Sequence, residues 1–403
     1  MADTGQPYSG VFEITKMERV RFGPDCINAL PADVEAAGGT KVFIVASNTL
    51  ATQTNVVDRI QGLLGDKAVG VFHNVSQHNH REEQIAAAAA ARVAGADFLV
   101  SVGGGSPIDC AKGIAMCLAD DITDPGTFDD YKILFEYPDK VEIRELKNKN
   151  APKHITISTT LSAGEFNGFL GITDSDRQVK EAYGDTALCP VASYLDPVLS
   201  VHTPEWLWAS TGIRAVDHCI ESYLAVNNMP FVDGLTKAAL EILVRDLPAA
   251  AKDREAVAAR GRCQIAAWMS IFGLPNVNLG LSHGIGHQLG ARRDVPHGVT
   301  SCLMLPHVMD FNFPVSKARQ ASLADAFQID RRDLSEDDAA RAFISELRRF
   351  IKDLGVPTRL SEVNVTKEDF PGIVSDALVD FVVATNPRSV TAADINGLLE
   401  AAY

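Results

Sequence analysis

The chain has 403 residues, which is too long for one small core and favours two domains. Its formal net charge of -15 argues against binding to nucleic acid or anionic lipid, because both require a basic surface. A small-molecule enzyme is therefore the favoured class. The seven cysteines form no CxxC pair, and the first residues form no leader segment. We expect a cytoplasmic protein without disulfides or membrane spans.

Apolar runs and helical segments alternate in the first half of the chain. Residues 41–47 (KVFIVAS) and 97–102 (DFLVSV) are rich in Val, Ile and Phe, which predicts buried strands. Residues 81–96 begin with acids, continue with alanines and reach a glycine near their end, which predicts a helix. This order predicts a parallel, doubly wound sheet. Residues 154–160 (HITISTT) predict a further strand.

A glycine-rich turn follows the strand at 97–102. Residues 103–117 read GGGSPIDCAKGIAMC, in which Ser106 and Pro107 suit the N-cap and N1 positions of a helix. A free helix N-terminus after such a turn favours phosphate binding, and the alternative is a turn required only for packing. The sequence is neither GxGxxG nor a Walker A motif, because Lys112 lies too far along the helix.

The pattern changes in the second half. Residues 120–150 are polar and predict a loop or a short irregular insertion. Beyond residue 195 helical patterns replace the alternation, so we predict an α/β domain over residues 1–195 and an all-helical domain over 196–403. Further helices are predicted around 233–250, 254–272 and 336–354, and Thr391 with Asp394 resembles a capping box.

A helix after residue 203 carries a polar stripe. Thr203 and Pro204 suit its N-cap and N1 positions. The stripe follows the spacing i, i+3, i+4 and i+7 and consists of Arg214, Asp217, His218 and Glu221. It is either a solvated face or a functional one, and the apolar residues around it favour function.

Residues 281–298 (LSHGIGHQLGARRDVPHG) hold three histidines. His283 and His287 share one helix face, and His297 lies between Pro and Gly, which suits a turn. Such a cluster can hold a metal, move protons or line a carbonyl pocket, and the alternative is buried histidines bonded to backbone. An HExxH metallohydrolase is excluded because Gly284 replaces the glutamate. Arg292 and Arg293 add charge either near a cleft or on an ordinary surface.

These segments together resemble the iron-containing (group III) alcohol dehydrogenase family. The resemblance rests on RVRFGPDCINAL, GGGSPIDCAK, STTLSAGEF, the His218 helix, the histidine-rich stretch and NPRSVTAADINGLL, in the family's order and spacing. It implies a dehydroquinate synthase-like fold, with an α/β dinucleotide-binding domain at 1–195 and an all-α catalytic domain at 196–403. It further implies an NAD(P)-dependent dehydrogenase or reductase of a small molecule and a homo-oligomer, commonly a dimer.

The resemblance also implies the residues that contact NAD or NADP. They are Ser47, His78, Gly104, Gly105, Ser106, Asp109, Thr159, Thr160 and Lys180. NAD-preferring members carry an acid where this chain has Ser47. A hydroxyl does not repel a 2′-phosphate as a carboxylate would, so we expect NADPH to be accepted.

The metal site departs from the family pattern. Members bind iron or zinc with one Asp and three His, and His218, His283 and His297 match the histidines. Arg214 stands where the Asp belongs, and an arginine cannot ligate a cation and repels one. We therefore expect no bound metal. The alternative is a zinc site made by the three histidines, with Asp217 as a substitute ligand.

The missing Asp and the short TTLSAGEF segment resemble the maleylacetate reductase branch, although those reductases typically carry Asn at the Arg214 position. We predict hydride transfer to a carbonyl or C=C of a small carboxylated substrate. Arg214 either stabilises the developing oxyanion or clamps a substrate carboxylate. His218, His283, His287 and His297 are candidates to donate the proton. The alternatives are a metal-dependent alcohol or aldehyde dehydrogenase and a non-catalytic binding protein.

Overall fold

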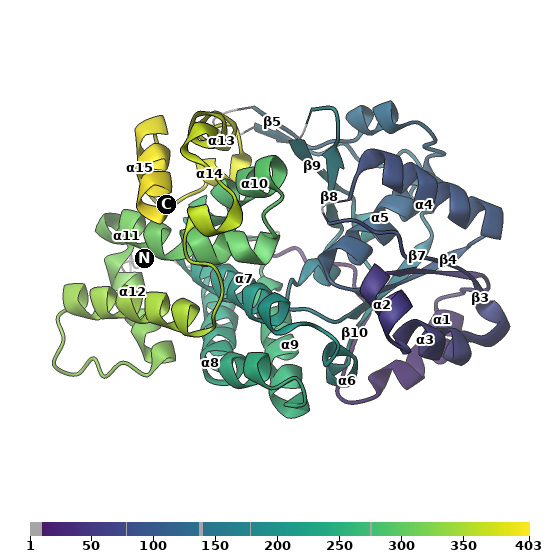
Figure 1. Cartoon of the computed structure of the whole chain (residues 1–403), viewed down its shortest axis with the longest axis horizontal. Helices are drawn as coiled ribbons and strands as arrows, with labels where there is room; N and C mark the ends of the chain where they lie inside the picture. The colour runs from purple at the N-terminus through teal and green to yellow at the C-terminus, as the bar shows by residue number, and fades with distance from the viewer. Residues whose placement is uncertain (1–9, 78, 137–139, 178, 275) are drawn as a thin grey trace.

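The computed structural model describes residues 10–77, 79–136, 140–177, 179–274 and 276–403. A six-stranded parallel sheet organises the first half of the chain (Figure 1), in the order β1, β10, β7, β4, β2, β3. Its strands are β1 (Arg19–Phe22), β2 (Val42–Ala46), β3 (Ala68–Phe72), β4 (Phe98–Gly103), β7 (Lys153–Ser158) and β10 (Ala192–Leu195). The strands predicted at 41–47, 97–102 and 154–160 are the central β2, β4 and β7, which confirms the parallel sheet.

Helices cover both faces of this sheet. They are α1 (Leu30–Ala36), α2 (Asn48–Gln53), α3 (Val56–Leu64), α4 (Arg81–Ala94) and α5 (Gly105–Ala119). Because side chains alternate along a strand, Phe43 and Val45 of β2 pack with α4 and α5, whereas Val42 and Ile44 pack with α1 and α3. Every residue of β2 and β4 is buried, as expected for the centre of a parallel sheet.

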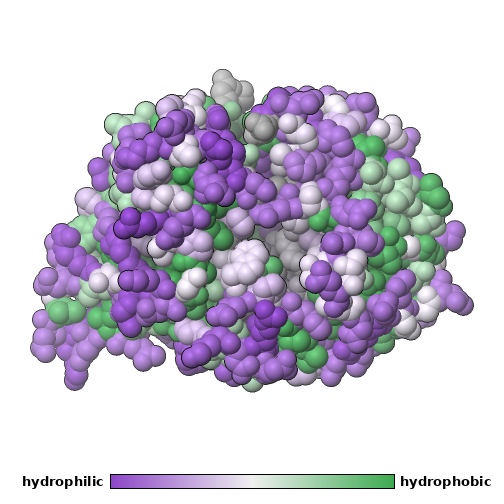
Figure 2. Space-filling view, viewed as in Figure 1, coloured by the Kyte–Doolittle hydropathy of each residue, from purple (hydrophilic) through white to green (hydrophobic). Residues whose placement is uncertain are grey.

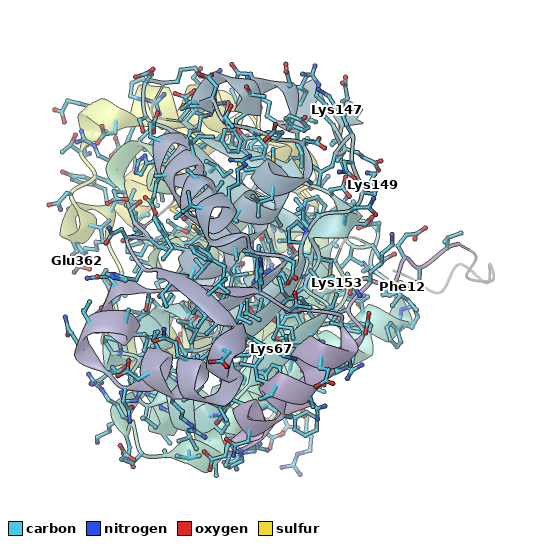
Figure 3. The ribbon with its side chains drawn as sticks, turned by 90° about the vertical axis from the view of Figure 1, so that its right-hand side faces the viewer. Phe12, Lys67, Lys147, Lys149, Lys153 and Glu362 are labelled. Carbon is cyan, nitrogen blue, oxygen red and sulfur yellow. The ribbon has the colours of Figure 1, made fainter. Side chains whose placement is uncertain are left out.

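The polar segment 120–150 is more ordered than the predicted loop. It forms a short 3-10 helix (Pro125–Asp130) and a hairpin of β5 (Leu134–Glu136) and β6 (Lys140–Glu142). The ring of Phe135 on this hairpin lies 6.3 Å from that of Phe381 in the helical half. Strands of three residues, LFE and KVE, are too short to show an alternating pattern that would predict them. Lys147 and Lys149, which follow the hairpin, are exposed (Figure 3).

A second hairpin, which the sequence analysis did not predict, consists of β8 (Phe169–Asp174) and β9 (Val179–Gly184). Arg81 at the start of α4 anchors it, because its buried guanidinium forms ion pairs with Asp174 and Glu181 of the hairpin and with Asp129. From this anchor β9 reaches across to the helical half, where it packs against α10 (Leu281–Arg293) (Figure 1). The hairpin thereby carries Lys180 toward the histidine-rich helix.

The second half is helical, as predicted. Its helices are α6 (Pro197–Ser200), α7 (Glu205–Leu224), α8 (Pro230–Lys252), α9 (Val257–Ile271), α10, α11 (His297–Leu323), α12 (Glu336–Asp353), α13 (Phe370–Ala377), α14 (Phe381–Ala384) and α15 (Ala392–Ala402). They share one large apolar core, and α7 is buried in it from Trp208 onward. Polar residues dominate the outer surface seen in Figure 2. Across the described part of the chain, no helix is both long and apolar enough to cross a bilayer.

Three helix starts were predicted, and two of them lie elsewhere. The helix after the glycine turn begins at Gly105 with Gly104 as N-cap, so Ser106 and Pro107 lie within its first turn. Proline is tolerated there because the first N–H groups have no partner within the helix. The N-cap of α7 is Pro204 rather than Thr203, whose hydroxyl instead donates to the carbonyl of Thr159. The capping box of Thr391 with Asp394 is confirmed.

Candidate functional site

The polar stripe on α7 is not a solvated face. Arg214, Asp217, His218 and Glu221 are each at most 5% exposed. They face the helices that carry the histidine-rich stretch, because Arg214 bonds to residues of α11 and Glu221 bonds to the start of α10. Burying four polar side chains on one helix requires partners for each of them. The stripe is therefore part of an enclosed polar cluster.

Glycines bring α7, α10 and α11 close enough for this cluster to form. A Cβ on Gly298 would lie 2.7 Å from the carbonyl group of Ser210, so α11 touches the backbone of α7 there. A Cβ on Gly286 of α10 would lie 2.6 Å from the hydroxyl of Thr300. Next to the first contact, Pro296 is the N-cap of α11 and His297 is its first residue. The predicted turn therefore places the third ring against α7.

Arg214 lies among the histidines. Its Nη2 donates to Nε2 of His297 at 2.7 Å, and its Nη1 donates to the hydroxyl of Ser301 at 3.1 Å. Within the described residues, no carboxylate oxygen lies within 4 Å of its guanidinium. Burial lowers the pKa of Arg214 to about 10, so the group stays charged at neutral pH. Burial also lowers the pKa of His297 well below its usual value, so this ring is the neutral acceptor of the bond.

Glu221 holds His283 at the N-terminus of α10. Its carboxylate accepts N–H groups from Gly280 and Ser282, each at 2.8 Å, and bonds to Nδ1 of His283 at 2.6 Å. A carboxylate in this place satisfies the free donors of the helix start. Because the carboxylate accepts, Nδ1 carries the proton of a neutral His283. The Nε2 of His283 is buried and has no partner among the described residues.

His218 and Asp217 complete the buried part of the cluster. The ring centroid of His218 lies 5.1 Å from that of His283 at an angle of 29°. Burial lowers the pKa of His218 well below its usual value, and His283 and Arg214 lower it further. Asp217 accepts a bond from the hydroxyl of Ser282 at 2.7 Å, and burial raises the pKa of its carboxyl.

This arrangement does not fit the divalent metal that the resemblance implies. The three histidines come together, but Arg214 uses the Nε2 lone pair of His297 that a metal would need. Its charge would also repel a cation at about 4 Å by several kcal/mol at a moderate effective dielectric. The atoms of Asp217, Glu221 and His283 that lie within 4.8 Å of one another do not replace the site, because His283 and Glu221 bond to each other.

His287 differs from the buried His218 and His283, because 32% of its side chain is exposed. Its Nδ1 lies 2.8 Å from Oδ2 of Asp380, which precedes α14. Its ring is parallel to that of His297, with centroids 5.4 Å apart. The sequence analysis missed Asp380 and Ser301. An aspartate 93 residues from His287 gives no local signal, and a serine one helical turn after His297 is too common in helices to stand out.

Arg292 and Arg293 lie on the surface and do not add charge to the cluster. Arg292 forms an ion pair with Asp376, and Arg293 forms one with Asp369. The interpretation that they lie near a cleft is therefore not supported, and the alternative of an ordinary surface pair holds.

The glycine turn between β4 and α5 lies beside the ends of two neighbouring strands. Gly103 has φ +140°, and a Cβ on it would lie 2.9 Å from Pro107. A Cβ on Gly104 would lie 3.0 Å from Thr160, so packing alone accounts for these two glycines. Gly105 has more room, since a Cβ would meet only Ser162 at 3.6 Å or more. Its position at the open N-terminus of α5 fits the approach of a phosphate group.

Four of the other predicted cofactor residues lie on the segments around this turn. Ser47 ends β2, and its hydroxyl accepts the N–H of Leu50 at 3.4 Å as the N-cap of α2. Thr159 donates its N–H to the carbonyl of Gly103. Asp109 lies half-buried one turn along α5 and accepts the N–H of Gly171 at 3.2 Å. Ser106 lies in the first turn of α5, and His78 lies outside the described residues.

Lys180 connects the glycine turn with the histidine cluster. Burial lowers its pKa, Asp109 raises it, and Arg214 lowers it further, so Lys180 is close to groups of both halves. The pKa of His297 is likewise lowered by Arg214 and Lys180. The structure thus brings together residues from β2, β4, α5, β7 and β9 on one side and from α7, α10 and α11 on the other. Open helix N–H groups beside Gly105 fit a dinucleotide phosphate, and the polar cluster lies beyond Lys180.

Comparison with known proteins covers both halves of the chain. Residues 17–197 match the family model described as iron-containing alcohol dehydrogenase. Residues 208–403 match the model described as Fe-containing alcohol dehydrogenase family, C-terminal. A 1,3-propanediol dehydrogenase from Klebsiella pneumoniae is 29% identical over 385 residues, which are 95% of this chain and 96% of that protein.

Solved structures agree with the fold. A 1,3-propanediol oxidoreductase superposes with a TM-score of 0.88 at 27% identity, over 98% of this chain and 100% of the other. A maleylacetate reductase from Agrobacterium tumefaciens superposes with a TM-score of 0.77 over 99% and 98% of the two chains. Its 23% identity carries a likeness of fold alone. The dehydroquinate synthase-like fold is confirmed, and the predicted branch stays a hypothesis.

Proposed function

The chain belongs to the iron-containing alcohol dehydrogenase family and is an NAD(P)-dependent oxidoreductase. We propose that it reduces a carbonyl or C=C group of a small carboxylated substrate and that it does so without a metal ion. The observation that carries the proposal is the bond between Arg214 and Nε2 of His297. It puts a fixed guanidinium charge where the family places a cation. The substrate class, as in maleylacetate reduction, follows from that charge.

The dinucleotide is held by the sheet half. Its pyrophosphate fits the open N–H groups of Gly105 and Ser106 at the start of α5, where the helix dipole favours an anion. Thr159 and Thr160 line the neighbouring strand end, and Ser47 lies at the ribose end. Lys180 interacts electrostatically with Asp109 of this half and with Arg214 of the helical half. When bound there, the reduced nicotinamide would supply the hydride that the substrate accepts.

Arg214 acts on the substrate oxygen in this proposal. A guanidinium has five N–H donors, and the bonds to His297 and Ser301 use two of them. Both of these acceptors are neutral, so the charge of the buried group remains available to an anion. A donor fixed in this way stabilises the negative charge that develops as hydride reaches the carbonyl carbon. A substrate carboxylate next to that carbonyl can also accept hydrogen bonds from the planar guanidinium of Arg214.

His287 supplies the proton. Of the other three candidates, His218 and His283 are buried and His297 is half-buried. Desolvation lowers the pKa of each well below its usual value, so they stay neutral. His287 reaches solvent, and Asp380 fixes the proton of its Nδ1, which leaves Nε2 to carry the transferred proton. Hydride and proton together convert the carbonyl to an alcohol and the reduced dinucleotide to its oxidised form.

Activity assays with purified protein test the substrate class. NADPH and NADH oxidation is followed by absorbance with a panel of short oxoacids and of aldehydes and ketones that lack a carboxylate. Turnover is expected with oxoacids at a much higher kcat/KM than with the uncharged carbonyl compounds. Equal or better turnover of the uncharged compounds contradicts the role of Arg214, and no turnover with any of them contradicts the proposed reaction.

The metal-free part of the proposal is tested separately. Metal analysis of the purified protein is expected to find far less than one iron or zinc per chain, and chelation is expected to leave activity unchanged. Arg214→Asp restores the family's ligand, so it is expected to gain metal and lose oxoacid reduction. Stoichiometric metal in the parent protein, or a variant with unchanged metal content and activity, overturns this account.

A second candidate is a metal-dependent dehydrogenase of simple alcohols or aldehydes. The 1,3-propanediol dehydrogenase relative supports it, and so does the gathering of His218, His283 and His297 in one cluster. This candidate requires Arg214 to leave His297 when metal binds. Loss of activity on chelation and its return with added zinc or iron would favour it over the first.

A further inference from the structure

The turn that follows β7 is fixed by side chains of the helical half. Residues 158–162 lie against the glycine turn, with the N–H of Thr159 bonded to the carbonyl of Gly103 at 2.9 Å. Just beyond, Ala163 has φ +60°, a left-handed conformation that costs an alanine free energy. A strained turn keeps its shape only when its surroundings hold it.

Three buried side chains of the helical half form hydrogen bonds to the backbone of this turn. Gln264 of α9 donates to the carbonyl of Ser158 at 3.2 Å. Thr203, which precedes α7, donates to the carbonyl of Thr159 at 2.6 Å. Thr211 of α7 accepts the N–H of Leu161 at 3.2 Å. The three bonds surround Thr159 and Thr160, whose side chains are the predicted dinucleotide contacts.

Thr211 is the decisive member of this set. Its hydroxyl donates to the carbonyl of Leu207 at 2.7 Å, so its oxygen is free to accept from Leu161. Leu161 is fully buried, and its N–H would have no acceptor if this oxygen were removed. A buried N–H group without a partner is costly, so the turn would shift to find one. Thr160, which precedes Leu161, would shift with it.

We infer that Thr211, together with Thr203 and Gln264, is a positioning residue for the dinucleotide, so that the helical half shapes the cofactor site of the sheet half. This inference rests on the proposed function, because it takes Thr159 and Thr160 as dinucleotide contacts. It goes beyond that function, since none of the three side chains was among the predicted cofactor residues.

Thr211→Val tests the inference by replacing the hydroxyl with a methyl group of similar size. The dissociation constants of NADPH and NADH, measured by fluorescence titration, are expected to rise at least about fivefold for the dinucleotide that binds the parent better. Thr211→Ser keeps the hydroxyl and is expected to bind within about twofold of the parent. The KM of the carbonyl substrate is expected to change less than that of the dinucleotide.

Thr236→Val is the matched control. Thr236 is buried on α8, and its hydroxyl also donates to carbonyls three and four residues earlier, but it has no bond to the turn. The control is expected to lower the melting temperature as Thr211→Val does and to leave dinucleotide binding unchanged. If Thr211→Val does not fold, Thr203→Val is measured instead. This variant removes only the hydrogen bond that the carbonyl of Thr159 accepts, and it leaves no buried N–H group without a partner. It is also expected to weaken dinucleotide binding, and unchanged binding overturns the inference.

The outcomes separate this inference from the proposed function. A folded Thr211→Val protein that binds the dinucleotide as tightly as the parent overturns the inference. Equal weakening in Thr236→Val also overturns it, because the effect would then follow general stability. A parent protein that binds neither NADPH nor NADH instead contradicts the dinucleotide site itself.

Discussion

Arg214 is placed by two residues of one helix. His297 and Ser301 are four positions apart, so they lie on the same face of α11 and accept the two ends of one guanidinium. Gly286 of α10 lies nearby, where a Cβ would lie 2.6 Å from the hydroxyl of Thr300, so the glycine allows α10 to approach α11. A single residue on α7 therefore places a buried guanidinium among the clustered histidines.

Ser47→Asp is expected to shift the preference of the enzyme from NADPH toward NADH. The new carboxylate at the end of β2 would repel a 2′-phosphate and accept bonds from the ribose hydroxyls of NADH. The ratio of kcat/KM for NADPH to that for NADH should fall by about tenfold or more, equal to 1.4 kcal/mol or more. Asp caps helices as well as Ser does, so α2 should be retained.

Ser47→Ala is the control for this charge effect. It removes the same hydroxyl and the N-cap bond to Leu50 without adding a charge. It is expected to change the use of both dinucleotides alike, so that their ratio is kept. A ratio that falls equally in Ser47→Ala and Ser47→Asp would contradict the assignment of Ser47 to the 2′ position.

His287→Gln is expected to slow the reaction at the proton step. Glutamine can still bond to Asp380 but cannot deliver a proton, so kcat should fall by about 10²-fold to 10⁴-fold. The dissociation constant of NADPH should stay close to that of the parent. His307→Gln on α11 removes a histidine outside the cluster, and unchanged kcat is expected for it. A His287→Gln protein with the parent's kcat would remove His287 from the mechanism.

At the scale of elements, the site depends on how closely α11 approaches α7. The contact at Gly298 involves the backbone carbonyl of Ser210, which cannot move aside as a flexible side chain can. The same contact places His297, the preceding residue, against α7. The geometry around Arg214 is therefore a property of helix packing as well as of the residues that form it.

Gly298→Ala is expected to destabilise the protein and to lower activity together. Its new Cβ would lie 2.7 Å from the Ser210 carbonyl, so α11 must shift, at a cost of about 1 to 3 kcal/mol. Urea unfolding measures the loss of stability, and kcat/KM measures the displacement of His297 and Ser301. An alanine variant with full activity would show that the position of α11 is not critical.

Gly234→Ala is a control that is expected to raise the free energy of unfolding, whereas Gly298→Ala is expected to lower it. Gly234 lies inside α8, is exposed, and has no atom within 4 Å of the place where a Cβ would stand. Alanine there is expected to raise the free energy of unfolding by about 0.5 to 1 kcal/mol, because glycine is the poorer helix former. Activity should be unchanged.

At the scale of the whole molecule, a buried carboxylate joins three parts of the sheet half. Asp33 on α1 bonds to Arg19 and Arg21 of β1 and to the hydroxyl of Tyr194 on β10. Chiefly through the bonds from Arg21, and against the effect of burial, these partners hold the pKa of Asp33 at about 2, below the value of 3.8 expected when unfolded. Because the folded pKa is the lower one, folding is favoured where the carboxyl is ionised.

Asp33→Asn is therefore expected to make the free energy of unfolding depend less on pH at acidic pH. The contribution of Asp33 is fully present above about pH 4 and is lost as the pH falls toward 2. Since both arginines are partly exposed, we expect a loss of only about 1 to 2 kcal/mol at pH 7. The difference between variant and parent should shrink below pH 4. Asp330→Asn, which removes an exposed ion pair with Arg332, should leave the profile unchanged.

Much of the fold could be read from local patterns. The strands at 41–47, 97–102 and 154–160 have apolar runs that only a buried strand accounts for, and the helical second half shows clear periodicity. The β8–β9 hairpin was missed because its segments are short and polar residues interrupt them. The starts of α5 and α7 were misplaced because Ser106 and Thr203 suit an N-cap locally, while tertiary contacts gave them other roles.

The sequence by itself determined the family, the two-part architecture and the histidines, because these depend on residue types at fixed spacing. It also predicts that Arg214 stands where the family has a metal-binding Asp. Only the tertiary structure decided that Arg214 bonds to His297, that Asp380 pairs with His287, and that Thr211 holds the turn beside Thr160. Each of these contacts joins residues 50 or more positions apart, and the packing of whole helices and strands sets such distances.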